Sequence, residues 1–168
     1  MYRIVMISIA FLLAAALVRA GERAISAEVI VNAPVSEVWN AWTTEEGVKS
    51  FLAPAAHVDA RVDGPFEILF DPSKPAGEQG SEGMRFLAIQ PMKMIAFTWN
   101  APPHLPEIRK QRTHVTVRFE RVDETHTRVN LTHVGWGSGG QWDEAFVYFQ
   151  KAWNGFVFPA LRKRFETR

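Results

Sequence analysis

The sequence predicts an α+β fold: one strand, two short helices, a run of antiparallel strands and a long C-terminal helix. Through much of residues 56–134, apolar side chains recur at every second position, which is the period of half-buried strands. From residue 141 onward the apolar period becomes that of a helix. A shorter helical stripe follows Pro34 and separates the first strand from the others.

The first predicted elements lie between residues 24 and 52. Residues 24–31 are rich in β-branched side chains and are expected to form a strand. Pro34 then occupies a favourable first helical position, because a first helical residue needs no backbone N–H. A second short helix is expected to begin at residues 44–46 and to present apolar residues toward the core.

Four further strands are predicted before residue 100. Alternating apolar residues indicate strands at 56–62 and 66–70, joined by an Asp-Gly-Pro turn. Two more strands are expected at 84–89 and 94–99, separated by a turn that contains Pro91.

Two long loops are also predicted. Residues 71–83 contain two prolines and three glycines, which is typical of a loop. Residues 100–112 contain three prolines and end in the charged run 107–112. We interpret that run as a solvated surface turn.

The next predicted hairpin joins a strand that contains residues 115–119 to a strand that contains residues 129–133. Its register follows from which face of these strands is apolar. For the alternating apolar residues of both strands to share one face, the numbers of paired residues must sum to an even value. A three-residue loop at 123–125 meets this condition and also sets Glu120 opposite Arg128. His133 is therefore predicted to point inward and His114 outward. The predicted apolar pairs are Val115 with His133, Val117 with Leu131, and Phe119 with Val129.

The C-terminal helix is expected to span residues 141–168, after a glycine-rich hinge at 135–140. Acidic residues in its first turn and basic residues near its end suit the helix dipole. Pro159 predicts a kink, because its ring would clash with the carbonyl of Gly155. Large apolar side chains are expected to share one helix face: Trp142, Phe146, Phe149, Trp153, Phe156 and Val157.

The first 20 residues have the pattern of a secretory signal peptide. Arg3 precedes an uncharged, apolar stretch over residues 4–18, and Ala20 supplies the small residue that cleavage requires. A membrane span needs about 20 apolar residues, more than this stretch offers. We expect an exported protein, periplasmic or secreted, with a mature domain at 21–168 and no stable membrane span. An uncleaved membrane anchor and a mistaken start codon are the alternatives.

The composition excludes several classes of function. A formal charge of +1 argues against a nucleic-acid-binding protein. The chain has no cysteine, so disulfides, thiol nucleophiles and thiolate metal sites are excluded. The five histidines lack the spacing of metal ligands, and the sequence has no nucleophile elbow or phosphate-binding loop. We therefore assign no metal, no cofactor and no catalytic residue.

Several motifs resemble a known superfamily. The Val-Asn-Ala-Pro sequence at 31–34, followed by Trp39 and Trp42, resembles the opening of the START-like, SRPBCC superfamily. Residues 97–103 and 127–136 resemble the branch similar to the C-terminal domain of the activator of heat-shock protein 90 ATPase. This resemblance implies the helix-grip (START/Bet v-like) fold, in which a curved antiparallel sheet wraps around the C-terminal helix. The fold hosts carriers, cyclases and chaperone cofactors, so it specifies no single activity.

The aromatic stripe of the C-terminal helix permits two interpretations. The rings either fill the core or line a cavity between sheet and helix, as the resemblance implies. We expect a cavity that binds a small hydrophobic molecule. His133 is then its lone polar group, although a core histidine bonded to a backbone carbonyl is an equal alternative. The candidate ligand-binding residues are Phe97, Trp99, Val117, Leu131, His133, Trp142, Phe146, Phe149 and Trp153.

Two other functions stay open at the level of sequence. A cyclase- or hydrolase-like enzyme would use His133 with a water molecule in the same cavity. His57 and Asp59 share a strand face and form a weaker acid–base candidate. A protein-interaction or chaperone-cofactor-like domain would act through residues 100–112, and an exposed apolar patch there would support it. The sequence does not specify the oligomeric state.

Overall fold

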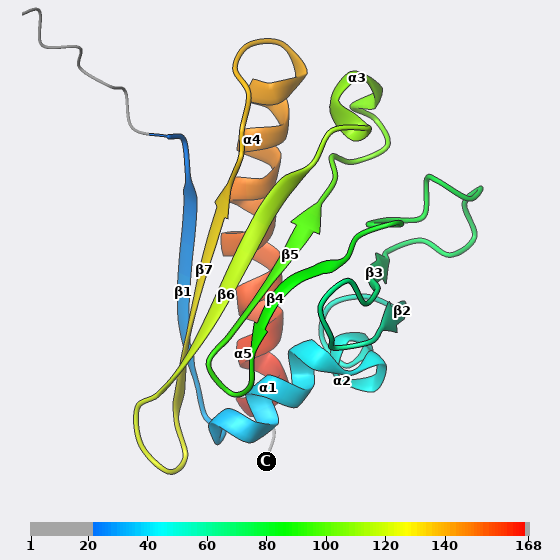
Figure 1. Cartoon of the computed structure of the whole chain (residues 1–168). Helices are drawn as coiled ribbons and strands as arrows, with labels where there is room; N and C mark the ends of the chain where they lie inside the picture. The colour runs from blue at the N-terminus through cyan, green and yellow to red at the C-terminus, as the bar shows by residue number, and fades with distance from the viewer. Residues whose placement is uncertain (1–21, 167–168) are drawn as a thin grey trace, which may run out of the picture.

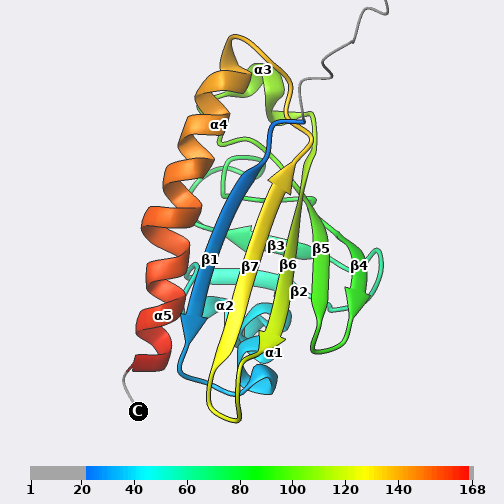
Figure 2. The ribbon, with the colours of Figure 1, turned by 90° about the vertical axis from the view of Figure 1, so that its left-hand side faces the viewer.

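A computed structural model describes residues 22–166, so the predicted leader at 1–20 lies outside the described residues. Five strands form one antiparallel sheet in the order β1-β7-β6-β5-β4, and a helical C-terminal segment packs lengthwise against it (Figures 1 and 2). The strands are β1 (Ile25–Val31), β4 (Phe86–Gln90), β5 (Met94–Trp99), β6 (Thr113–Arg121) and β7 (Thr127–Val134). This arrangement confirms the predicted α+β helix-grip fold.

The remaining elements surround this sheet. A two-stranded sheet contains β2 (Ala55–Val58) and β3 (Phe66–Leu69). The helices are α1 (Val35–Thr43), α2 (Glu45–Lys49), α3 (Pro106–Arg109), α4 (Gln141–Ala152), the π-helical turn η1 (Trp153–Val157) and α5 (Phe158–Glu166). Within residues 22–166, no helix combines the length and the apolar character that a bilayer crossing requires.

The two short predicted helices are present and meet at a tight corner. Thr44 caps α2, because its hydroxyl accepts a hydrogen bond from the Gly47 amide at 3.0 Å. A Cβ atom on Gly47 would lie 2.0 Å from the Asn40 carbonyl oxygen, so the corner requires glycine. Trp42 is fully buried, and Trp39 meets Phe119 of β6 edge to face.

The predicted register of the β6–β7 hairpin is confirmed. Val115 pairs with His133, Val117 with Leu131 and Phe119 with Val129. Glu120 also lies opposite Arg128, as predicted. His133 is completely buried and His114 is exposed. The requirement that paired residue numbers sum to an even value therefore assigned the two faces of the hairpin correctly.

The strands on either side of residues 59–65 are shorter than predicted. β2 ends at Val58, and Ala60 and Val62 are exposed. The chain turns there because the Arg61 amide donates to the Asp59 carbonyl at 2.7 Å. β3 ends at Leu69, so Phe70 is 45% exposed instead of continuing the buried face.

The segment 100–112 is not solely a solvated turn. It contains α3, which begins at Pro106, a residue suited to a helix start. Leu105 and Ile108 are buried against the core and hold this short helix in place. Arg109, from the charged run, lies largely inside the protein, with its side chain 14% exposed.

The C-terminal helix contains a π-helical turn where the sequence predicted a proline kink. The Phe158 amide donates to the Trp153 carbonyl, five residues back, and Pro159 follows without an N–H of its own. This wider turn accommodates Pro159 and changes the phase of the apolar stripe. Phe156 is therefore 58% exposed, contrary to prediction, whereas Phe158, Leu161 and Phe165 are buried.

Candidate ligand-binding site

The nine predicted ligand-binding residues converge between the sheet and the C-terminal helix. Trp142 and Phe146, near the start of α4, are half-buried. The other seven are buried: Phe97, Trp99, Val117, Leu131, His133, Phe149 and Trp153.

Direct ring contacts fill most of this space. The ring centroids of Phe97 and Trp99 lie 5.6 Å apart, and Trp99 lies 5.6 Å from Trp153. Phe66 of β3, which the sequence did not suggest as part of this group, contacts Phe97 at 4.3 Å. A void lined by Trp99 and Trp142 measures about 10 Å³, the space of one water molecule at most. The inner part of the stripe is therefore packed core.

His133 is held by two specific hydrogen bonds. The Trp153 indole N–H donates to His133 Nδ1 at 3.0 Å. Nδ1 is thus an acceptor, so the proton of the neutral ring lies on Nε2. Nε2 donates to the Thr113 hydroxyl at 2.7 Å, and that hydroxyl lies 3.3 Å from the Trp99 carbonyl, which accepts its proton.

This environment keeps His133 neutral. Burial, with a smaller contribution from the nearby His114, lowers the pKa of His133 to about 3. Both ring nitrogens already have partners, and the ring contacts Trp136 and Phe149. The geometry gives His133 a structural role, because neither ring nitrogen is free to activate a water.

An aromatic pocket of about 230 Å³ opens at one end of the packed interior, beside the segment 71–83. Phe149 is the predicted ligand-binding residue in its wall. Phe70 and Tyr148 were not predicted, although both are aromatic side chains more than 40% exposed. The lining residues are Phe70, Asp71, Lys74, Glu78, Gln79, Gly80, Asn100, Ala101, Pro102, Pro103, Arg109, Tyr148 and Phe149.

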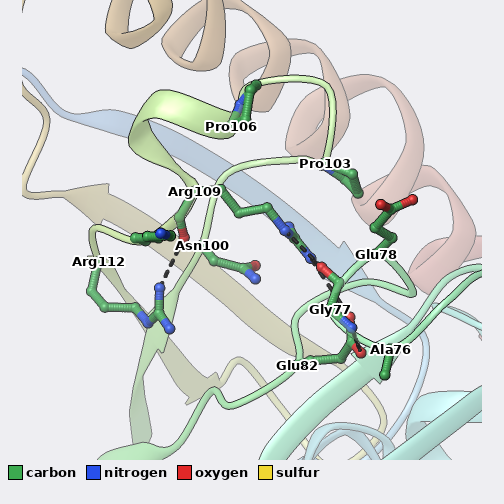
Figure 3. A pocket seen from close by; sticks show the side chains of 10 residues that line it. Ala76, Gly77, Glu78, Glu82, Asn100, Pro103, Pro106, Arg109 and Arg112 are labelled. Atoms are coloured by element: carbon green, nitrogen blue, oxygen red, sulfur yellow. Dashed lines mark hydrogen bonds and ion pairs between the residues drawn. The ribbon is translucent and has the colours of Figure 1, made fainter.

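A second, charged pocket of about 450 Å³ adjoins the first (Figure 3). The two pockets share four lining residues: Glu78, Asn100, Pro103 and Arg109. The charged pocket also contains Glu82, Lys110 and Arg112. Together the two pockets form a continuous recess between the segments 71–83 and 100–112.

Arg109 connects the two segments that frame this recess. Its Nε and Nη2 atoms donate to the Gly77 carbonyl, at 2.9 and 2.5 Å. Nη2 also donates to the Gly80 carbonyl at 2.9 Å, and Nη1 donates to the Ala101 carbonyl. Burial lowers the pKa of Arg109, and the Glu82 carboxylate, 3.6 Å away, opposes that shift. The guanidinium therefore acts as a clamp between loops.

The other sequence candidates find different roles. His57 is exposed, 3.9 Å from Glu45, whereas Asp59 pairs with Arg61. The large exposed apolar side chains of residues 22–166 all lie outside 100–112, so that loop offers no apolar docking patch. No group of three or more His, Asp or Glu side chains in the described part of the chain is arranged to hold a metal ion.

Comparisons with known proteins agree with this architecture. Residues 32–166 match the family described as activator of Hsp90 ATPase homolog 1-like protein. No curated protein sequence matches the chain. Among solved structures, protein MLL2253 from Mesorhizobium loti is 20% identical, with a TM-score of 0.67 over 86% of this chain and 97% of that chain.

Two further structures extend the likeness. Protein SSP2350 from Staphylococcus saprophyticus is 15% identical, with a TM-score of 0.65 over 86% of this chain and 92% of that one. PFC0360w, an Hsp90 activator from Plasmodium falciparum, is 22% identical, with a TM-score of 0.58 over 80% of this chain and 89% of that one. At these identities the likeness concerns the fold alone.

Proposed function

This chain belongs to the activator of Hsp90 ATPase homolog 1-like family, and from that premise we propose that it binds a small, largely apolar molecule in the aromatic pocket. The observation that carries the proposal is the clustering of Phe70, Tyr148 and Phe149 around an open recess of about 230 Å³. The site thus borders the predicted stripe at Phe149 and does not extend along its packed length.

The exposed rings at the pocket support this function. Tyr148 is 44% exposed and meets Phe149 edge to face at 5.0 Å. On its other side it contacts His104 at 5.7 Å. Aromatic faces left in water beside a recess are costly unless a ligand covers them, and binding would remove that apolar area from water.

The size of the pocket restricts the ligand. Typical sites for drug-sized molecules measure about 300–1,000 Å³, so the aromatic pocket suits a smaller, compact molecule. Its walls include Pro102 and Pro103 as well as three aromatic side chains, and aromatic rings stack well against a flat body. A long lipid chain would need the interior space that the packed core already fills.

A fluorescence titration with N-phenyl-1-naphthylamine, a neutral dye that brightens in apolar sites, tests this proposal. The wild-type protein is expected to bind the dye, and Tyr148→Ser to weaken binding by about five- to tenfold, since one ring contact is worth about 1–1.4 kcal/mol. Val147→Ser is the matched control, because Val147 is about as exposed as Tyr148 but lines neither the aromatic pocket nor the charged pocket. Equal binding by both variants, or no binding by the wild type, would contradict the proposal.

We also propose that the protein is exported, as its first 20 residues suggest. Expression of the full chain followed by N-terminal sequencing of the exported fraction tests this. The mature protein is expected to begin at Gly21. Retention of Met1 would count against a cleaved leader.

A further inference from the structure

Asn100 is a buried polar side chain in the wall that the two pockets share. It directly follows β5 and is only 7% exposed. Its Nδ2 atom donates to the Gly80 carbonyl at 3.2 Å. Because a carbonyl can only accept, this contact fixes which end of the amide is nitrogen and leaves Oδ1 on the opposite side.

The Oδ1 atom of Asn100 accepts no hydrogen bond from any side chain or backbone group within residues 22–166. Figure 3 shows the Asn100 side chain directed into the recess near Arg109. Oδ1 is not one of the fully buried side-chain atoms that lack a partner, so it reaches the recess, where water or a ligand can supply a donor. Asn100 therefore presents an acceptor to whatever occupies the pocket.

The charges around Asn100 restrict the kind of polar group that a ligand could place beside it. The Arg109 donors are directed at backbone carbonyls, so the guanidinium has little capacity left for an anion. The Glu82 carboxylate accepts from the Gly77 and Gln79 amides and adds negative charge nearby. The recess lining carries charges of both signs, so it favours neither an anionic nor a cationic group over a neutral one. These charged residues are Asp71, Glu78, Glu82, Lys74, Arg109, Lys110 and Arg112.

We propose that the ligand of the aromatic pocket carries a neutral hydrogen-bond donor, a hydroxyl or an N–H group, that binds Asn100 Oδ1. The inference rests on the proposed function and specifies its ligand class: a compact, flat apolar body with one donor at its edge. The body packs against Phe70, Tyr148 and Phe149, and the donor completes the hydrogen bonding of Asn100.

Two probes of nearly equal shape test this class. Indole has an N–H donor, whereas benzofuran has an oxygen in its place and no donor. Each is titrated against bound N-phenyl-1-naphthylamine, and the ratio of their dissociation constants is measured. The wild-type protein is expected to prefer indole by about five- to tenfold, the effect of one neutral hydrogen bond to an otherwise unpaired group.

Asn100→Leu removes the acceptor and keeps the approximate volume. In this variant the ratio is expected to fall to about one, because neither probe then finds a polar partner. Asn100→Leu also loses the bond to Gly80, so NMR of the wild-type protein supplies a second measurement. At saturation, the side-chain amide resonances of Asn100 are expected to shift more with indole than with benzofuran, because only indole adds a hydrogen bond to the ring-current effect that both probes share.

The outcomes separate this inference from the proposed function. Equal binding of indole and benzofuran by the wild type overturns the donor proposal while the aromatic pocket remains a binding site. A preference for indole that persists in Asn100→Leu also overturns it, because the donor then has another partner. Failure of the wild type to bind the dye or either probe overturns the proposed function itself.

Discussion

His133 and Asn100 are both polar side chains in the protein interior, but their hydrogen bonding differs. His133 is fully buried, and both of its ring nitrogens have partners, the Thr113 hydroxyl and the Trp153 indole. Asn100 is almost as buried, yet it donates to the Gly80 carbonyl and leaves its oxygen at a pocket wall. The first group is satisfied by the fold, whereas the second is only half satisfied.

This difference separates a structural polar group from a recognition group. A fully bonded interior network rigidifies the core and gives a ligand nothing to bind. An acceptor left open beside a recess provides an unmet interaction that a ligand can complete. By this criterion the sequence-level emphasis on His133 selected a structural residue, and the group suited to recognition lies nearby at the end of β5.

The largest expected effect comes from breaking the satisfied network at Trp153. Trp153→Ala should lower the free energy of unfolding by about 3–5 kcal/mol, because it removes a buried ring and the donor to His133 Nδ1. Urea unfolding followed by circular dichroism measures this. Phe156→Ala, in the same π-helical turn but 58% exposed, should cost less than about 0.5 kcal/mol. Similar losses in the two variants would show that the core assignment of Trp153 is wrong.

A second effect concerns the pH dependence of stability. The pKa of His133 is 6.5 in an ordinary environment and about 3 in the folded protein. Below pH 6.5 the unfolded chain therefore binds a proton that the folded chain does not, so stability falls as pH falls toward 3. Between about pH 7 and pH 5 this should remove about 2 kcal/mol from the free energy of unfolding.

His133→Gln isolates that contribution, because glutamine does not titrate. Its stability should change less than that of the wild type over the same interval, whatever its absolute value. Asp123 serves as an internal check: the Thr125 amide and His126 lower its pKa to about 2, so its contribution is lost only below about pH 4. Parallel pH profiles for wild type and His133→Gln would contradict a neutral, buried His133.

The smallest effect probes the clamp beside Asn100. Arg109→Met should cost about 1–2 kcal/mol and should speed amide hydrogen exchange at Gly77 and Gln79, because the carbonyls of the 71–83 segment lose their donor. Arg112→Met is the control, since Arg112 bonds only carbonyls of its own loop. Unchanged exchange rates in Arg109→Met would show that Arg109 does not hold the 71–83 segment in place.

Local periodicity predicted most of the helices and strands because the constraints that form them are local or pairwise, whereas the helix-grip arrangement was implied by the resemblance to a known superfamily. The β6–β7 register followed from which residues of one hairpin are apolar, and two short helices followed from Pro34 and Thr44. The exposure of Phe156 was not predictable from a helical period, because one π-helical turn changes that period. The phase of every later residue changes with it.

The recess was less predictable for a different reason. Arg109 finds its partners at Gly77 and Gly80, about thirty residues away, on a loop with no periodic pattern. Asn100 becomes a candidate ligand-binding residue only in the folded protein. There its Nδ2 atom donates to the Gly80 carbonyl, and the 71–83 segment forms part of the pocket wall. The exposed aromatic residues Phe70 and Tyr148 were the available signal, but each is unremarkable until the fold brings them together.

The π-helical turn also divides the C-terminal helix into two α-helical halves, α4 and α5, and changes how α5 is rotated about the helix axis. A continuous α-helix advances by about 100° per residue, so deleting one residue between this turn and Leu161 would turn Leu161 and Phe165 away from the sheet. Deleting Gly155 would instead remove the extra residue of the π-helical turn and keep both side chains directed at the sheet. The π-helical turn therefore fixes how the second half of the helix is rotated relative to the first, and both halves contribute buried side chains to the core.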